Sequence, residues 1–226
     1  MIEHEFDDIS SDLSRLNALS DGVISIAMTL LVFNLKVPEL ERDAPAPEVY
    51  NAVLRQVPSL ISLVIAFFGI GIWWLAHKRV LRNIAKYDRK LAMLNLTFLL
   101  MVALIPFSSA LVGTFPRYGI FTAMMFGLLS ALGLVVSSIW KYAESRRFVC
   151  EHVTAELSRY LVFRARTIGL VFGVAALAGV WVPIAASFIP IVIPFALRKV
   201  DSFSRSNIVD RSPQTMVGGD PEIGTE

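Results

Sequence analysis

The alternation of long apolar stretches with short polar ones is the first feature of this chain. Four stretches lack Asp, Glu, Lys, Arg and His altogether: 57–75, 91–112, 118–140 and 167–197. Because a hydrocarbon layer of about 30 Å needs roughly 20 helical residues, each of the first three predicts one membrane-spanning helix. The fourth is too long for one upright helix, and three prolines interrupt it. It predicts two short helices that turn near Pro183, with one long kinked helix as the alternative.

A shorter apolar segment, 22–35, precedes these four. At about 1.5 Å per residue it is roughly 21 Å long, which is less than the hydrocarbon layer. Extending the helix back to Leu16 supplies the missing length and places Asp21 inside the span. A carboxylate at membrane depth is costly and usually faces protein or water, so Asp21 is the first functional candidate. Acidic residues precede this helix, which argues against a signal peptide.

The composition agrees with a membrane protein. Of 226 residues, 55% are hydrophobic and 18% are charged, whereas about a quarter of a typical soluble domain is charged. This disfavours a nucleic-acid-binding protein, and the single cysteine excludes an intramolecular disulfide. In a six-span arrangement, 17 of the 21 lysines and arginines lie on the side that holds both termini. The exceptions are Lys36, Arg42, Arg55 and Arg117.

This charge asymmetry predicts that both termini are cytoplasmic. The expected architecture is an all-α, polytopic membrane protein with six transmembrane helices. An acidic cytoplasmic N-terminus covers 1–14, a six-helix domain covers 15–200, and a mobile cytoplasmic tail covers 201–226. We expect 36–56, which contains three prolines, to be an exposed connection.

Motifs for catalysis or tight metal binding are absent from the sequence. No pair among His4, His77 and His152 has the spacing of a zinc site on one helix, and neither a nucleophile elbow nor a phosphate-binding loop occurs. We therefore expect neither an enzyme, although an intramembrane hydrolase is conceivable, nor a cofactor.

Polar residues concentrate near the cytoplasmic ends of the first three spans. The hypothesis is a network in which Asp21 accepts hydrogen bonds from one or more of Arg15, Ser20, His77 and Asn95. It would tie the first three helices together, because intramembrane polar groups often link helices; direct ion coordination is the alternative. Trp73 and Trp74 are interpreted as interfacial anchors.

The first helix also carries an apolar stripe. Ile26, Leu30 and Phe33 recur at steps of four and three residues and therefore share one face, with Ser25 and Thr29 on a neighbouring face. On the residues alone, such a stripe is most often packed against another helix.

The segment 15–33 resembles the first helix of the transmembrane protein 175 family of endosomal and lysosomal potassium channels. Its motif is R-x-x-x-F-S-D-G followed by an A-M-T-L-L run, and Arg15, Ser20, Asp21 and Gly22 match it. Leu19 replaces the motif's phenylalanine, which keeps the position apolar. Further resemblance occurs at 74–77, 87–89, 94–96 and 106–107, so that roughly 13–113 is covered.

The resemblance implies a bacterial, inner-membrane member with one six-helix repeat, which assembles as a homotetramer around a central pore. It further implies that the first helix lines the pore, with Ile26, Leu30, Phe33 and nearby Thr29 at the constriction, and that Arg15, Ser20, Asp21, His77 and Asn95 hold this helix in place. The expected function is passage of K⁺ and other monovalent cations with weak preference for K⁺ over Na⁺, because no carbonyl filter sequence of the T-V-G-Y-G type is present. A proton- or solute-coupled transporter using Asp21 and His77 is one alternative, and a non-conducting scaffold is another.

Overall fold

The computed structural model describes the backbone of residues 2–195 and 197–198, and the side chains of residues 13–195 and 197–198. The described chain is helical, and its β-structure is limited to one antiparallel bridge between Ile84 and Val149. The elements in order are α1 (Ile2–Leu30), η1 (Leu31–Asn34), α2 (Ala46–Leu54), α3 (Val57–Leu81), α4 (Arg89–Thr114), α5 (Gly119–Ser145), α6 (Ala155–Gly179), α7 (Pro183–Ala186) and η2 (Ile189–Val192).

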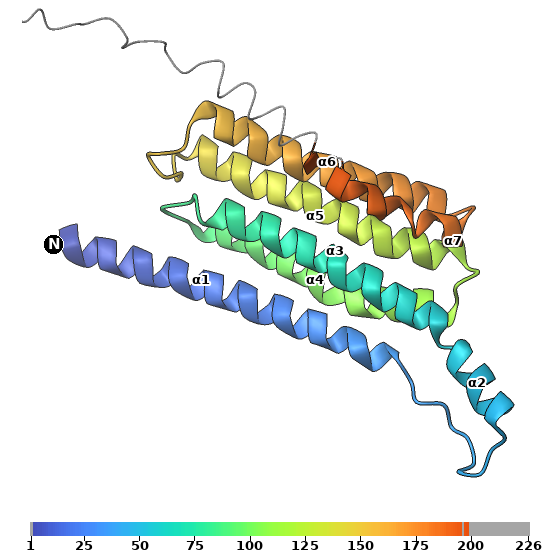
Figure 1. The fold of residues 1–226 in the computed structure, drawn as a ribbon. Helices are drawn as coiled ribbons and strands as arrows, with labels where there is room; N and C mark the ends of the chain where they lie inside the picture. The colour runs from blue at the N-terminus through green and yellow to red at the C-terminus, as the bar shows by residue number, and fades with distance from the viewer. Residues whose placement is uncertain (1, 196, 199–226) are drawn as a thin grey trace, which may run out of the picture.

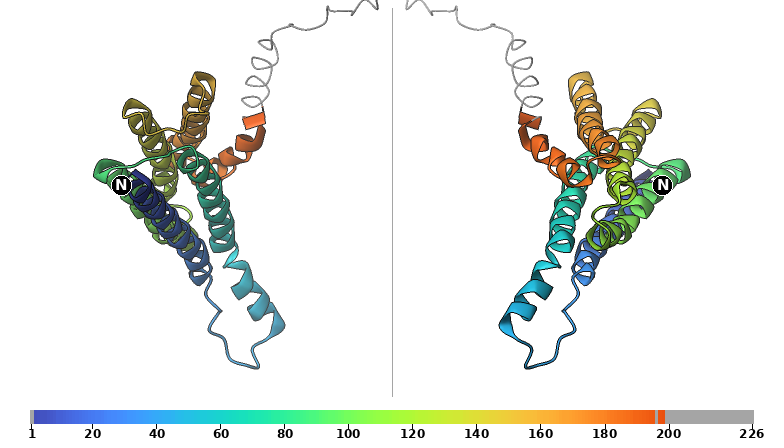
Figure 2. Two further views of the ribbon diagram at one scale, coloured as in Figure 1. Left: turned by 90° about the vertical axis from the view of Figure 1, so that its left-hand side faces the viewer. Right: turned by 90° about the vertical axis from the view of Figure 1, so that its right-hand side faces the viewer.

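The long helices lie side by side, with α1 at one edge of the bundle and α6 at the opposite edge (Figures 1 and 2). Helices α5 and α6 pack closely against each other, and α3 and α4 connect this pair to α1. Helix α1 packs on α3 and α4. It is therefore covered by the bundle on one side only.

The hydropathy pattern located the membrane spans well. Among the described residues, five helical segments are long and apolar enough to cross a membrane, and a shorter apolar helix occupies Pro183–Phe195. The predicted turn near Pro183 is present, because α6 ends at Gly179 and α7 begins at Pro183. That the last apolar segment forms a sixth span remains a prediction.

The structure differs from the sequence-based expectation at the loop 36–56, at the helix before Pro183 and at the boundary between residues 14 and 15. The expected loop 36–56 contains α2, which follows Pro45 and has Pro47 in its first turn, where the fixed φ of proline suits a helix. The first of the two short helices expected within 167–197 is instead α6, which has 25 residues, because it also includes the charged segment before Thr167. Helix α1 begins at Ile2, so the backbone is continuous across 14–15, and the expected tail 201–226 lies outside the described residues.

The α3–α4 loop and the α5–α6 loop, which lie at the same end of the bundle, are tied together. The backbone N–H of Ala85 donates to the Phe148 carbonyl at 2.7 Å, and that of Cys150 donates to the Asn83 carbonyl at 3.0 Å. Asp88 caps α4 through the Leu91 N–H, and its other carboxylate oxygen accepts from the Tyr142 hydroxyl at 2.6 Å. The hydrogen bond from Tyr142 lowers the pKa of Asp88. These contacts link the α3–α4 half to the α5–α6 half.

Small residues allow α5 and α6 to approach closely at the centre of the bundle. A Cβ added to Gly133 would lie 2.8 Å from the Trp73 ring and 3.0 Å from both the Ala165 carbonyl oxygen and the Gly169 Cα. Two of these neighbours are backbone atoms, which cannot move without separating the helices. In a membrane, such backbone proximity is a main source of helix association.

We predict that Gly133→Ala destabilises the bundle by about 1–3 kcal/mol through overpacking. Gly127→Ala is the matched control on the same helix, because a Cβ there has nothing within 4 Å. Thermal unfolding in detergent should show a lower midpoint for Gly133→Ala and an unchanged or slightly higher midpoint for the control. Equal midpoints for the two variants would contradict this close packing.

Candidate pore helix and its polar attachment

Helix α1 attaches to the bundle through one regularly spaced face. Leu16, Ser20, Ile24, Ala27 and Leu31 are all buried, and they recur at steps of four and three residues. This spacing places them on one side of the helix. Beyond α1, the Asn34 side chain in η1 donates to the Pro106 carbonyl at 3.2 Å, which fixes the far end of this segment to α4.

A buried polar chain crosses three helices near the other end of α1. The Asn95 amide of α4 donates to the Ser20 hydroxyl at 3.0 Å, and its carbonyl oxygen lies 2.7 Å from Nε2 of His77 on α3. The Ser20 hydroxyl in turn donates to the Leu16 carbonyl at 2.8 Å. The His77 ring stacks on Phe98 with ring centroids 4.2 Å apart. Asn95 is the shared member, so it joins α1 to α3 through α4.

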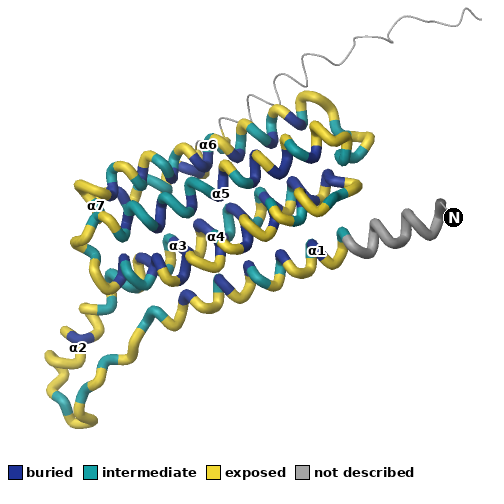
Figure 3. Tube along the Cα trace, turned by 180° about the vertical axis from the view of Figure 1, so that it is seen from behind, coloured by how far each residue is buried: buried dark blue, intermediate teal, exposed yellow. Residues whose placement is uncertain are grey.

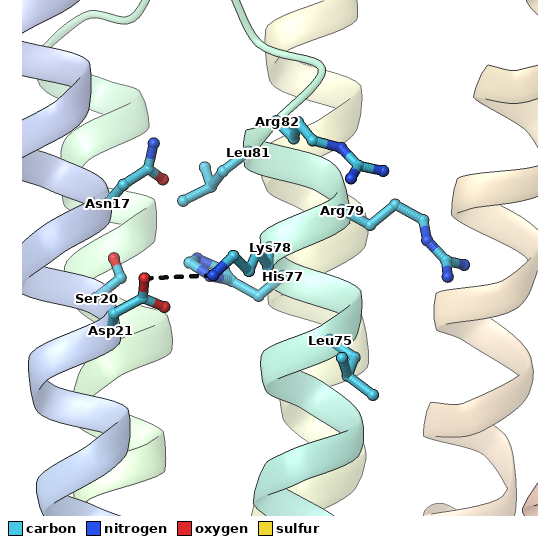
Figure 4. Close-up of a pocket in the computed structure, with 9 residues that line it drawn as sticks. All are labelled: Asn17, Ser20, Asp21, Leu75, His77, Lys78, Arg79, Leu81 and Arg82. Carbon is cyan, nitrogen blue, oxygen red and sulfur yellow. Dashed lines mark ion pairs between the residues drawn. The ribbon is translucent and has the colours of Figure 1, made fainter.

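Asp21 belongs to a separate, more exposed contact. Its carboxylate accepts from the Trp74 indole N–H at 2.8 Å and lies 3.6 Å from the Lys78 ammonium (Figure 4). Lys78 also sits over the Trp74 ring, 5.0 Å from its centroid. The partners expected from the sequence, Arg15, Ser20, His77 and Asn95, are thus replaced by two residues of α3.

The reason for this difference is the rotation of α1. Ser20 faces the core while Asp21, one residue later and about 100° around the helix, faces the groove beside α3. Arg15 is exposed and is not among the partners of Asp21 in the described part of the chain. Of the five expected network residues, the structure joins Ser20, His77 and Asn95 directly and places Asp21 next to them.

The opposite face of α1 is uncovered (Figure 3). The side chains of Ile26, Leu30 and Phe33, the last of which lies in η1 directly after α1, are 60%, 44% and 75% exposed, respectively. Thr29 is also exposed, and its hydroxyl donates to the Ile26 carbonyl of its own helix at 2.9 Å. Among the described residues of one copy of the chain, this apolar stripe is therefore largely uncovered, in contrast to the ordinary interpretation of such a stripe.

The described residues contain no group of three or more His, Cys, Asp or Glu side chains that could hold a metal ion. Exposed Ser25 and Thr29 instead place hydroxyl groups beside the apolar stripe of α1. Such a face can contact water, lipid or a second protein surface, but it has no nucleophile and base in contact. This face can therefore line a surface, but the side chains described on it do not form a catalytic or metal-binding group.

A family model described as endosomal/lysosomal potassium channel TMEM175 matches residues 15–106, from the start of the α1 attachment to the middle of α4. The solved structure of a lysosomal potassium-selective channel TMEM175 homolog from Chamaesiphon minutus resembles the chain with a TM-score of 0.70 and 26% identity. This similarity covers 83% of the chain and 98% of that structure. By both comparisons the chain is similar to the TMEM175 family.

Several relatives agree with this similarity. A potassium channel of Streptomyces collinus is 34% identical over 58% of the chain and 64% of its own length. A potassium channel of Chamaesiphon minutus is 26% identical over 83% of the chain and 95% of its own length. The zebrafish (Danio rerio) relative, an endosomal/lysosomal proton channel TMEM175, is 26% identical, and the match covers 26% of it. The family model and these relatives are described as ion channels and not as enzymes.

Sequence reasoning missed three residues of the attachment: Trp74, Lys78 and Phe98. Trp74 was assigned to the membrane interface and Lys78 to the basic cytoplasmic side, each from its residue type alone. Their spacing of four residues places them on one face of α3, and this was the available signal that both could meet the same partner. Nothing in the sequence pairs Phe98 with His77.

We predict that Asn95→Ala weakens the attachment of α1, because it leaves the buried Ser20 hydroxyl and His77 ring without their common partner. An unsatisfied buried polar group costs about 1–3 kcal/mol, so the thermal unfolding midpoint should fall. Thr97→Ala is the control, because Thr97 is exposed on the same helix and bonds only to the Met93 carbonyl of its own helix. A similar fall in the two variants would show that Asn95 makes no special contribution.

Proposed function

We propose that this protein is a potassium-permeable cation channel in which four copies of the chain surround a central pore lined by α1. The observation that carries the proposal is the uncovered face of α1, the helix at which the family match begins. The relatives named potassium channels support K⁺ as the permeant ion. Monovalent cations and the lipid bilayer are then its partners, and no cofactor is needed.

In this assembly Ile26, Leu30 and Phe33 form successive apolar rings, with Thr29 beside the first two. Apolar rings can gate a pore by excluding water. They offer no oxygen ligands to replace the hydration shell of an ion, so discrimination between K⁺ and Na⁺ depends on how much water each ion keeps. The channel should therefore prefer K⁺ weakly.

The polar residues have a supporting role in this proposal. Ser20, Asp21, His77 and Asn95 set the position and rotation of α1 without touching the ion, whereas Arg15 is exposed and has no part in this attachment among the described contacts. The 17 basic residues on one side support a topology with both termini in the cytoplasm of a bacterial cell and with the last apolar segment as the sixth span.

A transporter that relays protons between Asp21 and His77 is less well supported. Asp21 bonds to Trp74 and Lys78, whereas His77 bonds to Asn95. The two titratable side chains thus have different hydrogen-bond partners, and no direct bond between them is present in the described structure. A passive pore needs neither group to change its protonation state.

We predict that Ile26→Ala raises K⁺ flux through purified protein in liposomes and shifts the reversal potential toward equal permeability of K⁺ and Na⁺. The physical reason is a wider, better hydrated constriction. Leu134→Ala on α5 is the control, because Leu134 is 68% exposed, comparable to Ile26, but lies on a helix outside the pore. Single-channel recording measures both conductance and reversal potential.

Wild-type currents in Ile26→Ala would place the constriction elsewhere. Stoichiometric coupling between two solutes would instead identify a carrier. Absence of ion flux in the wild type would favour a non-conducting scaffold. A proton gradient imposed in the same liposomes tests whether protons also permeate, as the name of the vertebrate relatives suggests for those proteins.

A further inference from the structure

The apolar stripe that begins on α1 ends in a different kind of helix. The chain is α-helical up to Leu30, and η1 continues it as a 3-10 helix from Leu31 to Asn34. Leu35 is extended, and beyond it the chain leaves the bundle toward α2 (Figure 1). Phe33, the last member of the stripe, therefore lies in one short turn whose geometry is set separately from that of α1.

The helix type decides the direction in which Phe33 points. In a 3-10 helix, side chains three positions apart lie directly above one another, whereas in an α-helix they are about 60° apart around the axis. The 3-10 turn thus brings Phe33 into line with Leu30, and Asn34 into line with Leu31. The burial agrees with this, because Leu31 is fully buried and Asn34 is half-buried, while Leu30 and Phe33 are exposed.

One polar contact holds this turn against the bundle. The Asn34 side-chain amide donates to the Pro106 carbonyl of α4 at 3.2 Å, and it is the only side-chain hydrogen bond between η1 and another helix in the described part of the chain. Leu31 adds apolar packing on the same side. Apolar packing alone fixes the rotation of a membrane helix weakly, so the amide bond is the contact that specifies the turn.

The acceptor is well placed for this role. Pro106 is buried in the interior of α4, so its carbonyl belongs to a packed part of the bundle. A carbonyl oxygen has two lone pairs and can accept from a side chain in addition to its own helix. The nearby Ser109 hydroxyl pairs with Ser62 of α3 and therefore does not compete for the Asn34 amide.

We infer that Asn34 is a positioning residue of the pore: its hydrogen bond to the Pro106 carbonyl maintains the 3-10 turn and so keeps Phe33 in line with Leu30. The inference rests on the proposed function, in which α1 and η1 line the pore. Asn34 does not itself contact the ion, because its amide is directed toward α4. Without the bond the turn relaxes, and the Phe33 rings of the four copies are free to associate near the axis.

The first test measures the orientation of the turn through cysteine accessibility. Cys150 is the single native cysteine, so a Cys150→Ser chain can carry either Phe33→Cys or Val32→Cys. The purified full chain in liposomes is treated with a water-soluble, positively charged methanethiosulfonate, and the two reaction rates are compared. Phe33→Cys should react faster than Val32→Cys. Adding Asn34→Ala should lower the ratio of the two rates about threefold, which is the average worth of a side-chain hydrogen bond between membrane helices.

The matched control is Val37→Ala, three residues further along the chain. Val37 is 88% exposed and has no hydrogen bond through its side chain, so its substitution should leave the ratio of the two rates unchanged. The thermal unfolding midpoint and the oligomer mass of every variant show whether the fold and the assembly are retained.

The second test asks whether Asn34 acts through Phe33. In single-channel recordings Asn34→Ala should lower the K⁺ conductance, because the released Phe33 rings narrow the pore. In a Phe33→Ala chain the same substitution should have no further effect. A residue that only stabilised the fold would change the conductance equally in both chains.

Three outcomes would overturn the inference. The first is an unchanged ratio of reaction rates in Asn34→Ala, and the second is an equal change in Val37→Ala. The third is an effect of Asn34→Ala on conductance that is as large in the Phe33→Ala chain as in the wild type. Failure of the proposed function has a different sign: Phe33→Cys would then remain unreactive even with Asn34 in place, which would remove this face from the pore and the inference with it.

Discussion

The attachment of α1 is the constraint on which the rest of the structure depends. Apolar side chains gain little by facing another helix instead of lipid, so packing alone holds a membrane helix weakly in rotation. Polar groups have no such freedom, because an unpaired one at membrane depth is costly. The hydrogen bond between Ser20 and Asn95 near one end and that between Asn34 and the Pro106 carbonyl at the other therefore determine which face of α1 turns inward.

Once this rotation is set, the exposed face follows without further choice. Leu16, Ile24, Ala27 and Leu31 enter the core, and Ile26, Leu30 and Phe33 point outward on the opposite side. Helix α1 is thus packed where it meets α3 and α4, and it is uncovered on the face that is proposed to line the pore. The same rotation moves Asp21 out of the core and into contact with Trp74 and Lys78.

The two ends of the bundle differ in character. The end with most basic residues has the polar chain, the paired loops and the Asp88–Tyr142 bond, which together join α1, α3, α4 and α5. The other end has α2, α7 and η2, which are short and largely apolar helices.

The sequence by itself determined the helical class, the positions of four long spans and the turn before Pro183. It also indicated that the segment 15–22 contains polar residues that attach the first helix. These follow from hydropathy, proline and charge, which act along the chain and can be read one residue at a time. Only the tertiary structure decided that Asp21 bonds to α3 residues, that His77 meets Asn95 and Phe98, and that the Ile26 stripe is uncovered. These depend on how each helix is rotated about its axis, and that rotation is fixed by contacts between residues far apart in the sequence.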